Sequence, residues 1–306
     1  MRVGVVDLGT NSTRLLVADV DGGHVREVAR RTAITRLGES VDSRRRLLPL
    51  PVARVRNVLS DYRRELERLG AERVLAVGTS AVRDAENGEA FLGEIQWSYG
   101  FATRLVTGEE EAELTRRGVA NGRGLENGTL VLDVGGGSTE LITASGCASV
   151  DVGSVRLTDR HLHSDPPRPE ELAAAAQDVR GALPDLDASD AVGVAGTITT
   201  LAALELGGYD RDEVHGHRLT REGVETQLER LASLPVAERR ELPGLEPGRA
   251  PVIVGGAIVV REALERYGLD GLEASERDLL HGAALEAADL PEPEEGAAPA
   301  GAYTCC

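Results

Sequence analysis

Three short runs rich in apolar residues lie at the start of the chain, over 3–6, 14–20 and 25–30, and read as strands. The stretches DLGTNS and DGG separate these runs, and short turns of this kind between strands indicate antiparallel pairing. Over 52–69 the apolar residues instead recur at helical spacing, and Gly70 provides a C-cap. The pattern therefore predicts a three-stranded opening followed by a long helix.

The same opening occurs a second time in the stretch TLVLDVGGGSTELITA, which reads as strand, turn and strand, and CASVDVGS supplies a third strand. Both copies end their first strand in an Asp-x-Gly sequence, at Asp7 and at Asp133. The repetition predicts a duplicated α/β fold with domains at 1–122 and 123–290, and two unrelated hairpins are the alternative. Beyond Leu290, the composition of PEPEEGAAPAGAYTCC predicts a disordered tail over 291–306.

Length and charge narrow the class of protein. A chain of 306 residues with 41% hydrophobic residues is long enough for two domains with their own cores. No apolar run approaches the roughly 18 to 20 residues of a membrane span, and the N-terminus shows no signal-peptide pattern, so we expect a cytoplasmic protein. The net charge of −17 opposes non-specific binding to nucleic acid.

The cationic residues exclude several mechanisms, because all 34 of them are arginine and the chain contains no lysine. The P-loop nucleotidases, the kinases with a strand lysine and the Schiff-base enzymes all require a lysine. The three cysteines have no metal-binding spacing. A phosphate group must therefore be held by arginine, backbone amides or a metal ion.

The stretch DVGGGSTE is the strongest candidate for such a site. Glycines expose consecutive backbone N–H groups and allow a phosphate to approach closely, and the predicted nest comprises Gly135, Gly136, Gly137 and Ser138. Asp133 and Glu140 flank the nest, and their carboxylates favour Mg²⁺ as a bridge to phosphate. A tight turn that merely needs glycine is the alternative. The turn between the first two predicted strands has a similar combination of a carboxylate, a glycine and small polar residues, at Asp7, Gly9, Thr10, Asn11 and Ser12.

Four motifs in order, VVDLGTNSTRLLV, GTSAVRDAENG, GEEEAELTRRGV and LDVGGGSTEL, resemble the exopolyphosphatase/guanosine pentaphosphate phosphatase (Ppx/GppA) family. This family belongs to the actin, sugar kinase and heat-shock chaperone ATPase superfamily. The resemblance extends from residue 1 to about residue 288. It implies two actin-like (RNase H-like) domains with mixed sheets flanked by helices and an active site in the interdomain cleft.

The resemblance also implies roles for individual residues. Glu111 is expected to be the general base that activates water, although first-turn acids that complement a helix dipole are a common alternative. Arg83 matches the phosphate-contacting arginine of the family. Thr10 to Ser12 and Gly135 to Ser138 match phosphate-binding loops, and Asp7, Asp133 and Glu140 match the Mg²⁺ site. Gly196 and Thr197 resemble a second-domain loop that opens a helix over the cleft, and the resemblance implies that they too bind phosphate.

The expected function is a Mg²⁺-dependent phosphohydrolase that releases terminal orthophosphate from inorganic polyphosphate. The alternatives are a guanosine pentaphosphate 5′-phosphohydrolase, an ATP-using kinase of the same superfamily, and a non-catalytic phosphate or alarmone sensor. Inorganic polyphosphate or guanosine pentaphosphate is the expected partner, without specific nucleic acid or a membrane, and a homodimer fits the family. The stretch SRRRLL, with Arg44 to Arg46, is either a guide for a polyanion or a solvated loop.

Overall fold

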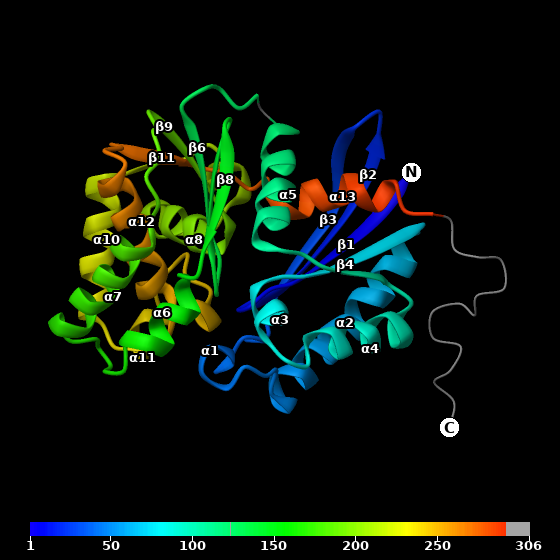
Figure 1. Cartoon of the computed structure of the whole chain (residues 1–306), viewed down its shortest axis with the longest axis horizontal. Coiled ribbons are helices and arrows are strands. Elements are labelled where there is room, and N and C mark those ends of the chain that lie inside the picture. The colour runs from blue at the N-terminus through cyan, green and yellow to red at the C-terminus, as the bar shows by residue number, and fades with distance from the viewer. Residues whose placement is uncertain (123, 292–306) are drawn as a thin grey trace. The chain divides into compact units, whose positions relative to one another are not determined.

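The computed structural model describes residues 1–122 and 124–291. The chain forms two compact units, each built on its own mixed sheet with helices against it (Figure 1). The first unit contains the described residues up to 122 together with those from Leu279 onward, and the second unit is Gly124–Asp278.

The first unit has a five-stranded sheet in the order β3-β2-β1-β4-β5. Its strands are β1 (Arg2–Leu8), β2 (Ser12–Asp21), β3 (His24–Ile34), β4 (Arg73–Gly78) and β5 (Ala102–Leu105). The first three strands are antiparallel, as the short turns between them predict, whereas β4 is parallel to β1 and β5 is parallel to β4. Its helices are α1 (Val41–Arg44), α2 (Pro49–Leu69), α3 (Ser80–Asp84), α4 (Gly88–Tyr99), α5 (Gly108–Ala120) and α13 (Leu279–Ala288).

Alternate residues of β1 enter two separate cores, which follows from the period of two along a strand. Val6 and Leu8 pack in one core with residues of α2 and α4. Val3 and Val5 pack in the other core with residues of α5 and α13. The sheet of the first unit is therefore covered by apolar side chains on both faces.

The second unit has a six-stranded sheet in the order β10-β11-β9-β6-β7-β8. Its strands are β6 (Thr129–Val134), β7 (Thr139–Thr143), β8 (Gly146–Val150), β9 (Asp190–Val194), β10 (Arg218–Thr220) and β11 (Gly271–Ala274). Its helices are α6 (Ser154–His161), α7 (Pro169–Ala182), α8 (Ala195–Leu206), α9 (Arg211–Val214), α10 (Arg221–Ser233), α11 (Val236–Arg239) and α12 (Ile253–Arg266), with a 3₁₀ turn η1 (Pro247–Arg249).

The two sheets repeat one topology, which confirms the predicted duplication. In each unit three antiparallel strands, β1-β2-β3 or β6-β7-β8, are extended by two parallel strands next to the first of them. Those parallel strands are β4 and β5 in the first unit and β9 and β11 in the second. The sheet of the second unit has β10 as an additional antiparallel edge strand.

The last helix, α13, belongs to the first unit and not to the second domain in which the sequence places it. The sequence places 279–290 in a second domain of 123–290, but the buried residues of α13 pack into the core of the first unit with β1 and α5. A local apolar pattern predicts a helix without identifying the sheet that buries it. Except for Pro291, the predicted tail over 291–306 lies outside the described residues.

None of the helices within residues 1–122 and 124–291 combines the length and hydrophobicity needed to cross a bilayer.

Candidate active site

The glycine loop at 135–138 joins β6 to β7 and is held from one side by the first turn of α6. The N–H of Ser154 donates to the carbonyl oxygen of Gly135 at 3.0 Å, and the N–H of Val155 donates to that of Gly136 at 2.8 Å. The carbonyl and the N–H of one peptide point in opposite directions. The two bonds therefore turn the N–H groups of Gly136 and Gly137 away from α6. The loop therefore presents backbone donors on its other side, as a phosphate-binding nest requires.

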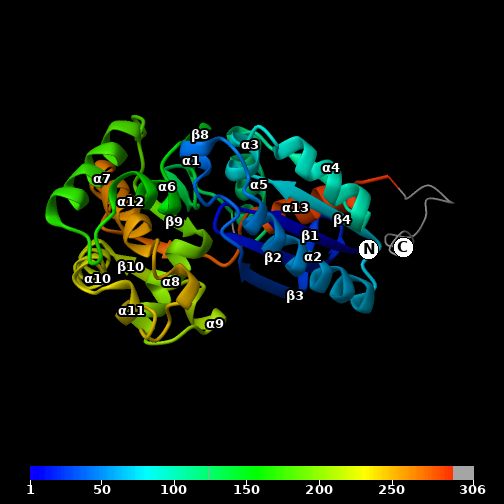
Figure 2. The ribbon, with the colours of Figure 1, turned by 90° about the horizontal axis from the view of Figure 1, so that it is seen from below.

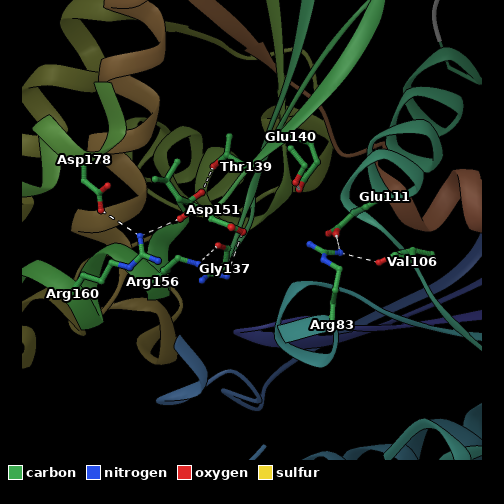
Figure 3. A network of polar contacts seen from close by, with 12 residues as sticks. Arg83, Val106, Glu111, Gly137, Thr139, Glu140, Asp151, Arg156, Arg160 and Asp178 are labelled. Atoms are coloured by element: carbon green, nitrogen blue, oxygen red, sulfur yellow. Dashed lines mark hydrogen bonds and ion pairs between the residues drawn. The ribbon is translucent and has the colours of Figure 1, made fainter. Parts of the chain in front are cut away.

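Two residues outside the predicted motif fix this loop. Arg156 is buried, and its Nε donates to the carbonyl oxygen of Gly137 at 2.6 Å (Figure 3). A Cβ atom at Gly153 would lie 2.6 Å from the oxygen of Gly136 and 2.8 Å from the nitrogen of Gly137, so only glycine permits the approach of α6. Neither residue was predicted from the sequence, because a glycine and an arginine near a predicted strand do not show which loop they contact.

The carboxylates of the second unit lie opposite one another. Asp133 on β6 pairs directly with Glu140 on β7, so both side chains lie on the same face of the sheet. Both residues are buried, and Glu140 accepts a hydrogen bond from the hydroxyl of Ser149 at 2.8 Å. Like charges in direct opposition destabilise a sheet, and a divalent cation between them removes the repulsion.

This pair fits the oxygen ligands that Mg²⁺ prefers, with substrate oxygens and water to complete the shell. In the described ranges, 1–122 and 124–291, no group of three or more His, Cys, Asp or Glu side chains is arranged to hold a metal ion.

The corresponding turn in the first unit lies between β1 and β2. It closes through a hydrogen bond from the N–H of Gly9 to the carbonyl oxygen of Ser12 at 3.1 Å. Asp7 is buried and forms an ion pair with Arg14, whose Nη2 lies 2.7 Å from Oδ2 of Asp7. This arginine, directly opposite Asp7 in the β1–β2 register, was not identified from sequence. Asp7 thus has a cationic neighbour, whereas Asp133 lies opposite a second carboxylate.

Asn11 in this turn has a buried polar side chain whose hydrogen-bonding groups are not used within the described part of the chain. Its side chain is buried, and neither Oδ1 nor Nδ2 forms a hydrogen bond to any residue in the described part of the chain. Buried amide atoms are nearly always hydrogen-bonded in folded proteins. Asn11 therefore has one free donor group and one free acceptor for a bound group, in agreement with the predicted phosphate-binding role of the turn.

Arg83 and Glu111 are brought together within the first unit. Arg83 lies on α3 and Glu111 on the first turn of α5, and Nη1 of Arg83 is 3.1 Å from Oε2 of Glu111 (Figure 3). The same Nη1 donates to the carbonyl oxygen of Val106 at 2.9 Å. Both side chains are largely buried, with exposed fractions of 23% and 12%. The predicted phosphate-binding cation and the predicted base are thus in direct contact.

The neighbouring acid, Glu110, has a structural role. Thr107 is the N-cap of α5, and its hydroxyl accepts from the N–H of Glu110, whose carboxylate accepts from the N–H of Thr107 at 2.8 Å. This capping box and the guanidinium of Arg104 hold the pKa of Glu110 below its usual range. Because the box fixes the first turn of α5, it also fixes the position of Glu111 one residue later.

Gly196 and Thr197 lie at the start of α8, as predicted, but the structure gives them packing contacts. A Cβ atom at Gly196 would overlap the guanidinium of Arg249, so glycine is needed there for the close approach of this arginine. Thr197 is buried against Gly256 of α12. Ala195, just before them, has a φ of 68°, which is a strained conformation for a residue with a Cβ.

Each unit therefore carries its own set of the predicted residues. The first unit contains the turn at 9–12, Asp7 and the Arg83–Glu111 pair, and the second contains the nest at 135–138, the Asp133–Glu140 pair and the start of α8. Beyond these, the structure adds Arg14, Gly153 and Arg156, which contact the predicted residues directly.

Comparison with known proteins gives consistent matches over nearly the whole chain. The model of the Ppx/GppA phosphatase family matches residues 16–290. A Mycobacterium tuberculosis protein named exopolyphosphatase 2 is 42% identical over an alignment that covers 94% of this chain and 98% of the relative. A solved exopolyphosphatase-like protein is 35% identical, with a TM-score of 0.86 and coverage of 94% and 98%. The Ppx/GppA member of Aquifex aeolicus is 32% identical, with a TM-score of 0.77 and coverage of 94% and 97%.

Proposed function

Because the chain belongs to the Ppx/GppA phosphatase family, we propose that it is an exopolyphosphatase that releases terminal orthophosphate from inorganic polyphosphate. The Arg83–Glu111 contact at 3.1 Å is the observation that supports the proposal, because a guanidinium able to bind phosphate lies next to a carboxylate able to accept a proton. The name of the Mycobacterium tuberculosis relative supports polyphosphate as the substrate.

In the proposed reaction Glu111 orients a water molecule and accepts its proton. The water oxygen forms a bond to the terminal phosphorus, and the bond from that phosphorus to the bridging oxygen breaks. The products are orthophosphate and a chain that is shorter by one phosphate. Phosphoryl transfer of this kind depends on positioning and on neutralising charge rather than on a strong nucleophile.

The other residues bind and neutralise the phosphate groups. Arg83 donates hydrogen bonds to phosphoryl oxygens, and the N–H groups of Gly136 and Gly137 and the amide of Asn11 do the same. The N–H of Gly135 instead donates within the loop to the carbonyl oxygen of Ser138 at 3.1 Å. Asp133 and Glu140 would hold Mg²⁺, which neutralises phosphate charge when bound. Asp7, beside Arg14, belongs to the same proposed set.

Orthophosphate release by the purified protein with Mg²⁺ tests the proposal. The substrates are short polyphosphate, long polyphosphate, guanosine pentaphosphate and ATP. We expect release from polyphosphate that exceeds release from ATP. Preferential release from guanosine pentaphosphate would identify the alternative phosphohydrolase, and tight binding without release from any substrate would identify a sensor.

A further inference from the structure

Three consecutive arginines on the first unit, Arg44, Arg45 and Arg46, are exposed. Most arginines in the described part of the chain contact a carboxylate, as Arg56 does with Glu94 at 2.6 Å. By contrast, none of these three side chains forms an ion pair or a hydrogen bond with a residue in 1–122 or 124–291. In a chain with a net charge of −17, such a group of unpaired cations is available to an external anion.

These arginines belong to a segment, residues 35–47, that is attached at its start to the predicted phosphate-binding turn. We call this segment the arginine arch. The N–H groups of Thr35 and Arg36 donate to the carbonyl oxygen of Asn11 at 3.1 and 2.9 Å, and the N–H of Gly38 donates to that of Thr10 at 2.8 Å. The arch thus begins at the residues that carry the turn.

The other end of the arch is attached to the segment that follows α3, the helix that carries Arg83. The N–H of Glu86 donates to the carbonyl oxygen of Arg45 at 2.8 Å. Asn87 accepts from the N–H of Leu47 at 2.8 Å and donates to the carbonyl oxygen of Leu47 at 3.1 Å. Figures 1 and 2 both show α1, the helix within the arch, beside α3.

Packing holds the arch in one conformation. Leu37, Val41 and Leu47 are buried in the core that also contains Leu8 and Ala81. A Cβ atom at Gly38 would overlap the methyl group of Thr10, so the chain approaches the turn as closely as glycine allows. The three cations are therefore held on an ordered segment rather than on a free loop.

We propose that the arginine arch is a binding site for internal phosphates of a polyphosphate chain, separate from the terminal phosphate at Arg83. The inference rests on the proposed function, because it assigns the arch to the same substrate. A polyphosphate carries a negative charge on every phosphate, so a chain that extends past the turn meets further cations. We expect a short substrate to contact fewer of these cations than a long one.

A nucleic acid is the less suitable polyanion for this site. Proteins that bind single strands combine cations with aromatic side chains that stack on the bases. Residues 35–47 contain no aromatic residue. Their arginines can therefore attract an anion by charge, but the segment has no aromatic ring on which a base could stack. The composition of the arch therefore favours a polymer without bases.

Equilibrium binding to the Glu111→Gln variant tests the inference, because we expect this variant to bind polyphosphate without hydrolysing it. The probes are fluorescently labelled long polyphosphate and tripolyphosphate. The test variant is Arg44→Ala/Arg46→Ala; Arg45 is kept because its backbone has a φ of 52° and binds Glu86. The control is Arg230→Ala/Arg240→Ala, which removes two exposed arginines of the second unit that likewise form no ion pair with a described residue.

We expect the test variant to bind long polyphosphate about three- to tenfold more weakly. The slope of log affinity against log salt concentration should become shallower by about one to two, because two cations are removed. Binding of tripolyphosphate should change less than about twofold, and the control should leave both affinities nearly unchanged. Equal losses in the test and control variants, or equal losses for long and short chains, would overturn the inference. So would tighter arch-dependent binding of single-stranded RNA than of long polyphosphate.

This test separates the two claims. If the parent protein releases no orthophosphate from polyphosphate but still binds long chains through Arg44 and Arg46, the proposed function fails and the binding site stands. If the parent protein hydrolyses polyphosphate and the test variant binds like the control, only the binding site fails.

Discussion

At the residue scale, the sequence predicts candidate side chains for a site but not the residues that hold them in place. The glycine loop at 135–138 and the carboxylates around it could be proposed as a site, because a glycine run flanked by acidic residues can be recognised within a short stretch of sequence. Arg156, which binds the nest, and Arg14, which binds Asp7, could not be predicted, because their contacts depend on the position of α6 and on the β1–β2 register. Register is a tertiary property that a short motif does not contain.

The opposition of Asp133 and Glu140 gives a prediction about stability. Without Mg²⁺, Asp133→Asn should leave the free energy of unfolding equal or raise it by about 0.2 to 1 kcal/mol, because the repulsion between two carboxylates is removed. With Mg²⁺, the wild type should gain stability that the variant lacks. Urea denaturation with and without Mg²⁺ measures both effects.

The control for this measurement is Asp187→Asn, which removes an exposed carboxylate of the same unit. It should retain the full stabilisation by Mg²⁺. Equal stabilisation by Mg²⁺ in the wild type and in Asp133→Asn would remove Asp133 from the metal site.

At the element scale, the hydrophobic pattern predicted the helices and strands well, including α13 at the end of the described chain. It did not predict that α13 packs against α5 in the first unit, because amphipathic spacing shows that a face is buried and not what buries it. This packing affects the candidate site, because α5 carries Glu111 and α13 packs against α5.

The contact between these helices depends on Gly282. A Cβ atom at this position would overlap the backbone carbonyl of Leu114 on α5. We expect Gly282→Ala to lower the free energy of unfolding by about 1 to 3 kcal/mol, because either helix must shift. Urea denaturation gives this value, and orthophosphate release should fall as α5 moves.

The matched control is Gly93→Ala on α4, where a Cβ atom meets nothing within 4 Å. This exposed helical position should gain up to about 1 kcal/mol, because alanine has the higher helix propensity. A Gly282→Ala protein as stable as the wild type would contradict the close packing of α13 on α5.

At the scale of the whole molecule, the duplication could be predicted because both copies retain the Asp-x-Gly turn, and the shared sheet topology confirms it. The return of the chain to the first unit at Leu279 could not be predicted, since it depends on contacts between residues far apart in sequence. The second unit is thus one continuous segment, whereas the first needs two.

Fragments of the chain test this organisation. Residues 124–278 should fold alone, with helical circular dichroism and a cooperative urea transition. Residues 1–122 should not, because Val3, Val5 and Leu114 lose the apolar cover of α13. Adding 279–291 to 1–122 through a flexible linker should restore cooperative unfolding. Cooperative unfolding of 1–122 by itself would contradict the role of α13.

The most direct test of the central claim is orthophosphate release from polyphosphate by Glu111→Gln beside the wild type. The glutamine keeps the size of the side chain and removes the base, so turnover should fall about 100- to 10,000-fold. The affinity for polyphosphate should change only a few-fold, because Arg83 and the nest are retained. Turnover equal to that of the wild type would show that Glu111 is not the base and would contradict the proposed mechanism.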